Sequence, residues 1–248
     1  QIYTPLKATA SEDRPAIVLL HGYFGTHTNW QVFSQALADR VETNVYVPDL
    51  RNHGQSAWGL PMTYDDFSAD LGRYLEENHL DRAFVVGHSV GGSIAMHGCL
   101  HLDMSIAQVI SGIFLVDIGP KAMLNIPQVD LYLECCRLVR EYRPKSLEDA
   151  DAFLIQFIDV TYIREHILQA CKWSENDQAF LPGFDIEKAK DYYMGMIDFP
   201  MTRRTYNTYK GRAHFFMGDD SPLVSSLTEE DIQPFMANFT ISVLEGGH

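Results

Sequence analysis

One serine lies in a sequence pattern that can make its hydroxyl a nucleophile. Residues 87–91 read Gly-His-Ser-Val-Gly, with Ser89 at the centre, and they stand between an apolar run and a helix-compatible stretch. Glycines on both sides let a strand and a helix approach closely while the serine is held at a sharp turn. The first N–H groups of that helix, at Val90, would point toward an oxyanion formed there. The pattern indicates acyl-group chemistry at Ser89.

A serine hydroxyl needs a base, because it is a weak nucleophile at its ordinary pKa. His248 is the candidate, since it follows an expected strand and the flexible pair Gly246 and Gly247. A terminal histidine can also begin a purification tag, but the stretch SVLEGGH continues a credible strand and loop. We therefore expect His248 to accept the proton of Ser89.

A carboxylate must then fix the tautomer of the histidine. Asp117 ends an apolar run in VDIGP, and Asp220 lies in FMGDDSPLV. An aspartate after a strand can also be a helix N-cap, which needs no catalysis. The residues alone leave the two aspartates as alternatives. A second oxyanion donor is expected from the loop HGYFG, at the backbone N–H of Tyr23.

The elements that position these residues alternate between short apolar runs and longer amphipathic ones. The expected strands are residues 16–20, 44–49, 83–87, 112–117, 212–218 and 239–244; the expected helices are 29–40, 63–80, 129–142, 147–158, 162–173, 186–196 and 228–238. Near-continuous apolar strands are typical of a parallel sheet covered on both faces. Thr63 and Asp66 form a variant of the capping box at one helix start.

The resulting fold class is α/β, with a mostly parallel central sheet flanked by helices. The strand rhythm stops after Asp117 for about 80 residues, so residues 119–199 are expected to be a helical cap or lid inserted into a core of residues 1–118 and 200–248. Many aromatic residues and methionines in the insertion suit a lid over an apolar cleft, although they could equally pack its helices together. They include Tyr132, Phe153, Phe157, Trp173, Tyr192, Tyr193, Met194 and Met196.

Composition limits the class of partner. The 248 residues carry a net charge of −14, which disfavours nucleic acid and anionic membranes. No apolar run reaches the length of about 18 residues that a membrane span requires. Four cysteines without CxxC spacing suit a reducing compartment. We expect a cytoplasmic protein, or an organellar one if a targeting segment precedes Gln1.

Several motifs together resemble the α/β-hydrolase superfamily, and the resemblance spans nearly the whole chain. They are HGYFGTHTNW, DLRNHGQS, GHSVGG, VDIGP and the terminal EGGH. HGYFG and DLRNHGQS more narrowly resemble the small acyl esterases and thioesterases of the bacterial YbfF type and the related yeast ethanol acetyltransferases. The resemblance implies a triad in the order serine, acid, histidine, and a helical cap between the sixth and seventh core strands.

The resemblance also bears on the choice of acid. The superfamily's common G-x-x-D spacing, counted from Gly218, falls on Ser221, which has no charge to stabilise an imidazolium. The narrower relatives place the acid at the end of the preceding strand, where this chain has Asp117. Asp117 is therefore the expected acid, and Asp220 is the alternative.

Other candidate residues are assigned supporting places. Phe24, His88 and Trp30 are expected to line the substrate pocket, although His88 is equally well explained as a packed neighbour. Polar residues of DLRNHGQS could also take part in chemistry, namely Asp49, Arg51, Asn52 and His53, but the loop is expected to be structural, with Asp49 and Arg51 holding a turn beside the site.

The spacing of two further histidines raises the question of a metal. His97 and His101 stand four residues apart, but Gly98 occupies the position where a zinc protease has its glutamate. We expect no metal and no cofactor.

The expected activity is cleavage of a carboxylic ester or acyl thioester of a small to medium acyl group through an acyl-enzyme. An alcohol acyltransferase would use the same triad, and a ligand receptor built on the same fold is a second alternative. The expected partner is a small-molecule ester or thioester. The sequence does not determine the oligomeric state.

Overall fold

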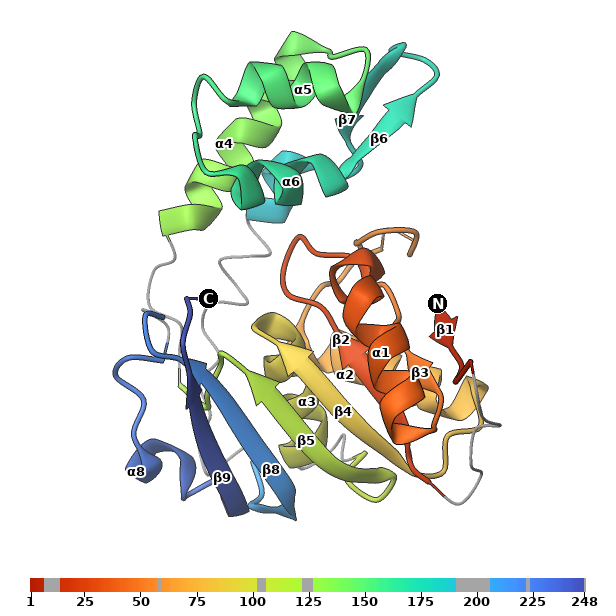
Figure 1. Cartoon of the computed structure of the whole chain (residues 1–248), viewed down its shortest axis with the longest axis vertical. Helices are drawn as coiled ribbons and strands as arrows, with labels where there is room; N and C mark the ends of the chain where they lie inside the picture. Colours follow the sequence, from red (N-terminus) through yellow and green to blue (C-terminus); the bar gives the residue numbers. More distant parts are fainter. Residues whose placement is uncertain are drawn as a thin grey trace.

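The central element is a seven-stranded sheet. The structure is a computed structural model, and it describes residues 1–6, 14–57, 59–101, 106–121, 127–190, 206–221 and 224–247. The strand order is β1-β3-β2-β4-β5-β8-β9, and the pairs are parallel except for β1 with β3 (Figure 1). The strands are β1 (Ile2–Tyr3), β2 (Ala16–Leu20), β3 (Val45–Tyr46), β4 (Ala83–His88), β5 (Ile110–Val116), β8 (Tyr209–Gly218) and β9 (Met236–Leu244). The expected α/β fold with a mostly parallel sheet is confirmed.

Helices cover both faces of this sheet. A 3-10 helix (His27–Trp30) leads into α1 (Gln31–Val41), which packs on one face with Ile17 and Leu19. Helices α2 (Tyr64–Glu77) and α3 (Val90–Leu100) pack on the other face with Val18 and Leu20. Successive side chains of β2 therefore enter opposite layers, as the alternation along a strand requires.

A helical segment lies above the carboxyl ends of the parallel strands (Figure 1). It contains α4 (Pro127–Tyr142), α5 (Leu147–Leu154), α6 (Thr161–Gln169), the antiparallel pair β6 (Cys171–Ser174) and β7 (Ala179–Pro182), and helical residues 186–190. We call residues 127–190 the cap segment. It has its own buried cluster, which includes Leu133, Cys136, Val139 and Ile167, so its helices are held together independently of the sheet.

Three expected helices end more than a helical turn early in the structure, one of them being 147–158, which ends at Leu154. The helix expected over 162–173 ends at Gln169, and residues 171–182 form a β-hairpin instead. Its turn is closed by Ser174, which accepts a hydrogen bond from the N–H of Asp177, and Gln178 adopts a φ of 51°. This polar turn chemistry overrides the helical periodicity.

The third difference is near the end of the chain. The helix expected over 228–238 is only α8 (Glu229–Ile232), and β9 begins at Met236. Pro234 explains the early end, because proline has no N–H to continue the helical hydrogen bonds and its ring clashes with the carbonyl one turn earlier. The expected helix over 186–196 is described only as far as residue 190.

The expected capping box at the start of α2 is confirmed. The Thr63 side chain accepts from the N–H of Asp66, and the Asp66 side chain accepts from the N–H of Thr63. We predict that Thr63→Ala lowers the free energy of unfolding by about 1 kcal/mol, because one helix N–H loses its partner. Urea denaturation measures this change. Thr63→Ser keeps the hydroxyl and should stay within a few tenths of wild type; an equal loss in both variants would contradict the capping explanation.

Candidate active site

Ser89 lies between a strand and a helix, at the expected turn. β4 ends at His88 and α3 begins at Val90, and Ser89 has φ 51° and ψ −122°. Its N–H donates to the carbonyl of Val116 on the neighbouring strand at 3.0 Å. Positive φ is sparsely populated for residues other than glycine, so the surrounding structure must hold the serine there.

Glycines make this turn possible. A Cβ added at Gly87 would lie 2.3 Å from the nitrogen of Gly92, and one at Gly91 would lie 2.6 Å from the carbonyl oxygen of Leu20. Any side chain at either position would therefore push α3 away from β4 or β2. The glycines hold the helix N-terminus against the sheet, which directs the first N–H groups of α3 to the vicinity of Ser89.

The loop that follows β2 approaches the same turn. A Cβ added at Gly22 would lie 2.9 Å from Nδ1 of His88 and 3.5 Å from Cβ of Ser89. Residues 21–26, which we call the HGYFG loop, are thus packed directly against the serine turn. Tyr23, the residue expected to supply the second oxyanion donor, directly follows this contact in the chain.

Two buried histidines join the HGYFG loop to the loop after β3. His21 Nδ1 donates to the carbonyl of Gly22 at 2.8 Å, and its Nε2 accepts from the N–H of Leu50 at 3.0 Å. His53 Nδ1 donates to the carbonyl of Arg51 at 2.8 Å, and its Nε2 accepts from the N–H of Phe24 at 3.0 Å. Because each ring has one acceptor and one donor as partners, both histidines must be neutral.

Burial also keeps these rings neutral. It lowers the pKa of His21 to about 3, with the neighbouring His53 adding to the effect, and it lowers the pKa of His53 to about 4. From the sequence, His53 was considered only as part of a loop expected to be structural, and His21 was not singled out. The only signal available was that each is part of a motif, HGYFG or DLRNHGQS.

Asp49 and Arg51 hold the second loop, as expected. Asp49 accepts from the N–H groups of His27 and Gln55, at 2.6 and 2.9 Å. Burial opposes its ionisation, but these hydrogen bonds and the His27 ring outweigh burial and lower the pKa of the Asp49 carboxyl. Arg51 pairs with Asp70 at 2.5 Å. Both side chains are engaged in structure, so the Asp49 carboxylate is not available as a triad acid.

Asp117 directly follows β5, which pairs with the strand that leads to Ser89. It is 3% exposed, and its φ is 53°. One carboxylate oxygen accepts from the N–H of Gly218 at 3.0 Å, and the other accepts from the hydroxyl of Ser221 at 2.5 Å. Residues 118–121 are not helical, so the helix N-cap interpretation of Asp117 has no support.

Asp220 is placed differently. It is exposed, and its N–H donates to the carbonyl of Gly246 at 3.0 Å. The neighbouring Asp219 accepts from the N–H of Gly246 at 2.9 Å. A Cβ at Gly218 would lie 2.4 Å from the carbonyl oxygen of Gly246. The backbone just before position 248 is therefore fastened to the same loop that holds Asp117; His248 itself lies outside the described residues.

The three expected pocket residues do not lie together. Phe24 points into the cap segment, where its ring stacks on Tyr132 with centroids 3.9 Å apart. His88 is half-buried against Gly22. Trp30 packs with the cluster under α1, on the face that also holds Ile17. Phe24 and His88 are thus near the serine turn, whereas Trp30 belongs to a different layer.

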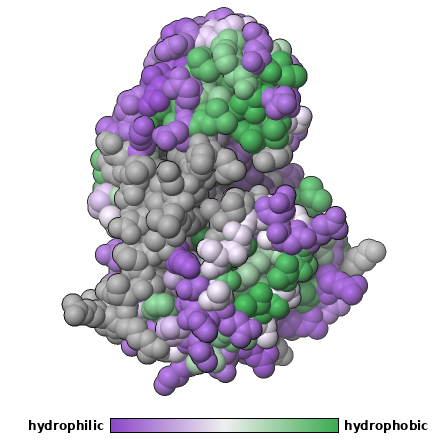
Figure 2. All heavy atoms as spheres, turned by 90° about the vertical axis from the view of Figure 1, so that its left-hand side faces the viewer, coloured by the Kyte–Doolittle hydropathy of each residue, from purple (hydrophilic) through white to green (hydrophobic). Residues whose placement is uncertain are grey.

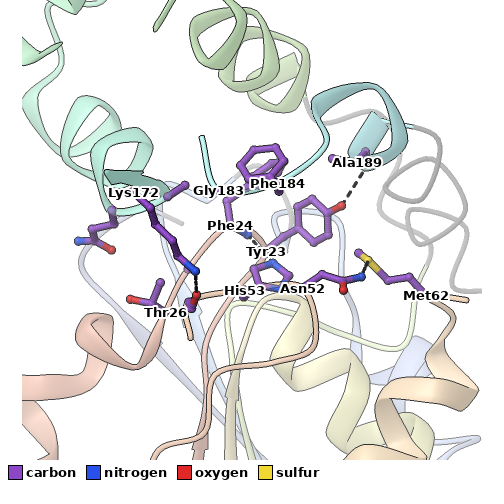
Figure 3. A pocket seen from close by; sticks show the side chains of 14 residues that line it. Tyr23, Phe24, Thr26, Asn52, His53, Met62, Lys172, Gly183, Phe184 and Ala189 are labelled. Atoms are coloured by element: carbon purple, nitrogen blue, oxygen red, sulfur yellow. Dashed lines mark hydrogen bonds between the residues drawn. The ribbon is translucent and has the colours of Figure 1, made fainter. Parts of the chain in front are cut away.

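A small cavity of about 30 Å³ lies between the HGYFG loop and the cap segment (Figure 3). Tyr23, Phe24 and His53 line it from the core, and Lys172 and Phe184 line it from the cap segment. Ser89 is not among its lining residues. We interpret this space as part of the contact between core and cap segment and not as the substrate site.

Several aromatic side chains of the cap segment pack on one another. Tyr142 stacks on Phe153 with centroids 4.0 Å apart, and Trp173 meets Phe180 edge-on at 5.3 Å. Figure 2 shows apolar side chains gathered on an outer face of the upper part of the molecule. Within the cap segment, Ile155 and Phe157 are each about half exposed. Tyr192, Tyr193, Met194 and Met196 lie outside the described residues.

His97 and His101 lie beside Asp65, and ligand atoms of the three lie within 4.8 Å of one another. The two imidazole rings are stacked with an angle of only 16° between their planes. Stacked rings direct their in-plane lone pairs along parallel lines, whereas a metal ion needs them to converge. The arrangement instead satisfies His97, which bonds to Ser68 and Asp65.

The chain belongs to the alpha/beta hydrolase family, whose model matches residues 17–248. It is 29% identical over 241 residues to the sn-1-specific diacylglycerol lipase ABHD11 of Xenopus laevis, covering 94% of this chain and 74% of that protein. It is 24% identical over 260 residues to ethanol acetyltransferase 1 of Wickerhamomyces ciferrii, covering 94% and 63% respectively. These relationships support hydrolase or acyltransferase activity.

Solved structures agree with the fold. A marine microorganism esterase superimposes with a TM-score of 0.81 at 22% identity, covering 100% of this chain and 91% of the esterase. Within the part of the chain that the structure describes, no helix combines the length and apolar character needed to cross a membrane.

The neutral state of His53 makes a prediction about pH. Its pKa is about 4 in the folded protein against an ordinary value of 6.5, so the unfolded chain binds more protons between these values. The stability that depends on neutral His53 is complete above pH 6.5 and is lost as the pH falls toward 4. We predict that between pH 7 and 5 the wild type loses on the order of 2 kcal/mol more unfolding free energy than His53→Gln does.

Urea denaturation at the two pH values measures this difference. The glutamine side chain introduced by His53→Gln would still offer an oxygen to the N–H of Phe24, so the variant should fold. His79→Gln, at an exposed position, is the matched control and should leave the pH dependence unchanged. Identical pH dependence in wild type and His53→Gln would show that His53 is not held neutral.

Proposed function

We propose that this chain is a serine hydrolase that cleaves carboxylic esters or acyl thioesters of small to medium acyl groups through an acyl-enzyme. The observation that carries the proposal is the backbone of Ser89, held at φ 51° between β4 and α3 beside a buried aspartate on the next strand. Family membership and the esterase, lipase and acetyltransferase relatives are consistent with it.

Each step of the reaction has a candidate group. Ser89 attacks the acyl carbonyl, and His248 accepts its proton and later donates one to the leaving group. The N–H groups of Tyr23 and Val90 stabilise the tetrahedral oxyanion, a role in which one donor is worth roughly 10²–10³ in rate. Asp117 orients the imidazole. No cofactor takes part in this scheme.

Asp117 is favoured over Asp220 because of its surroundings. It is buried on the strand adjacent to β4, and two hydrogen bonds hold both of its carboxylate oxygens. Ser221, at the position where the superfamily commonly has an acid, donates one of those bonds. We interpret Ser221 as a hydrogen-bonding support for the acid, which in this chain follows β5 and not β8. Asp220 is exposed and contributes its backbone to the loop.

Acyl transfer to an alcohol is a second candidate, and the relationship to ethanol acetyltransferases favours it. The triad and the oxyanion donors would be the same, and the acceptor of the acyl group would be an alcohol in place of water. Residues 119–199 would act as the lid that decides which acceptor enters. The substrate in either case is a small-molecule ester or thioester.

The proposal predicts that Ser89→Ala lowers hydrolysis of p-nitrophenyl butyrate by at least about a thousandfold, because the acyl-enzyme cannot form. A fluorophosphonate probe should label the wild type and not the variant. Ser93→Ala changes a buried serine one turn further along α3 and should retain activity and labelling. Binding of the ester without release that depends on Ser89 would instead favour a receptor.

The choice of acid makes a separate prediction. Asp117→Asn should lower turnover by about 10⁴-fold, because the amide favours the wrong histidine tautomer. Asp220→Asn should remain within about threefold of wild type, since an exposed side chain is changed. Steady-state kinetics on the same ester measure both. A severe loss in Asp220→Asn with a mild one in Asp117→Asn would reverse the assignment.

A further inference from the structure

One peptide group of the HGYFG loop is held from two sides by histidines of different parts of the molecule. The N–H of Phe24 donates to Nε2 of His53 at 3.0 Å, and the carbonyl of Tyr23 lies 3.2 Å from Nε2 of His166. These N–H and C=O groups belong to the same Tyr23–Phe24 peptide. A carbonyl only accepts, so Nε2 of His166 carries a proton, whereas Nε2 of His53 does not.

This peptide needs support because of the backbone that follows it. Phe24 has φ 62°, a left-handed conformation that costs an aromatic residue about 1 kcal/mol or more. Rotation of the Tyr23–Phe24 peptide would relieve that conformation. The same rotation would change ψ of Tyr23, the residue whose N–H is the expected oxyanion donor. The two histidines oppose this rotation by holding the N–H and the C=O of the peptide.

His166 belongs to α6 of the cap segment, and its position there is fixed by packing. Its ring meets Tyr132 edge-on at 5.6 Å, and Tyr132 stacks in turn on Phe24. Two residues earlier, Arg164 is buried and pairs with Asp151 of α5 at 2.7 Å. Burial lowers the pKa of His166, so the ring is in the neutral state, with one N–H to give. The ring of His166 is thus held against the HGYFG loop by packing and an ion pair within the cap segment.

The HGYFG loop is also where other parts of the cap segment attach. The hydroxyl of Tyr23 donates to the carbonyl of Ala189 at 3.2 Å (Figure 3). Beyond the loop, the amide of Asn29 donates to the side chain of Gln169 at 3.2 Å. Among the described contacts between core and cap segment, the one from His166 reaches the backbone next to the expected oxyanion donor. The hydrogen bond from His166 therefore links the cap segment to the backbone of the residue that carries the expected donor.

We propose that His166 is a positioning residue for the oxyanion donor, so that seating of the cap segment on the HGYFG loop completes the site. This inference rests on the proposed function, since it takes the N–H of Tyr23 as an oxyanion donor. His166 does not touch the reacting atoms in this scheme. It acts by fixing the Tyr23–Phe24 peptide, and with it ψ of the residue that carries the donor N–H, whose position matters most when negative charge develops on the substrate oxygen.

Substitution of His166 tests the proposal by steady-state kinetics on p-nitrophenyl butyrate. His166→Leu removes the hydrogen-bond donor to the Tyr23 carbonyl. It should lower kcat about tenfold and keep KM within about twofold, because the contact of the Tyr23 N–H with the substrate oxygen strengthens only in the transition state. His166→Gln can place an amide N–H near the same carbonyl and should recover most of kcat. Affinity for a trifluoromethyl ketone, which forms a tetrahedral adduct at the serine, should fall about tenfold in His166→Leu and recover in His166→Gln.

Gln169→Ala is the matched control, because it removes a different bond between cap segment and core and leaves the Tyr23–Phe24 peptide untouched. It should keep kcat within about twofold of wild type. If His166→Leu fails to fold, as judged by thermal unfolding, His166→Asn serves instead, since it is polar but too short to reach the carbonyl.

Three results would overturn the proposal: a kcat within about twofold of wild type in the variant without the donor, a loss confined to KM, or an equal loss in Gln169→Ala. Failure of the proposed function is distinguished by Ser89→Ala measured in parallel. Full turnover by Ser89→Ala would refute the proposed function, because no acyl-enzyme could form at residue 89. An inactive Ser89→Ala together with a fully active His166→Leu would refute only the role of His166.

Discussion

The contact of α3 with the sheet is the constraint on which the rest of the site depends. Glycines at 87 and 91 bring the helix N-terminus within backbone contact of β4 and β2, and the residue between strand and helix has no room for ordinary backbone geometry. Ser89 therefore takes a positive φ and lies where helix N–H groups point. The rest of the site is arranged around this fixed point, with Gly22 packed against it and Asp117 on the adjacent strand.

The second organising feature is a network of neutral buried histidines. His21 and His53 each connect two loops by using one ring nitrogen as donor and the other as acceptor. Such a group can join an N–H to a carbonyl without introducing a charge into a dry interior. His166 extends the network to the cap segment. The loop beside the serine is therefore supported by His21 and His53, whose accepted bonds depend on the rings remaining uncharged, and by the bond that His166 donates.

Much of this architecture could be predicted from the sequence, because it depends on local patterns. The apolar runs before Ser89 and Asp117 indicated adjacent buried strands, and Thr63 with Asp66 indicated a helix start. The hairpin at 171–182 was missed because its turn is specified by side-chain hydrogen bonds, which periodicity does not register. The contacts of His166 and Ser221 were also missed, since they join residues far apart in the chain. Trp30 lies close to the HGYFG loop in the sequence. The 3-10 helix nevertheless places its ring in the cluster under α1, away from Ser89.

The stacking of Phe24 on Tyr132 has a consequence for building chimeric proteins from members of this family. Phe24 is encoded within the catalytic core, but its side chain is part of the interior of the cap segment. If only the cap segment were exchanged, the ring of Phe24 would pack against the cap segment of another protein, whose interior does not match it. The transplanted unit would have to include residues 21–26 as well, so the modular boundary in three dimensions is not the boundary along the chain.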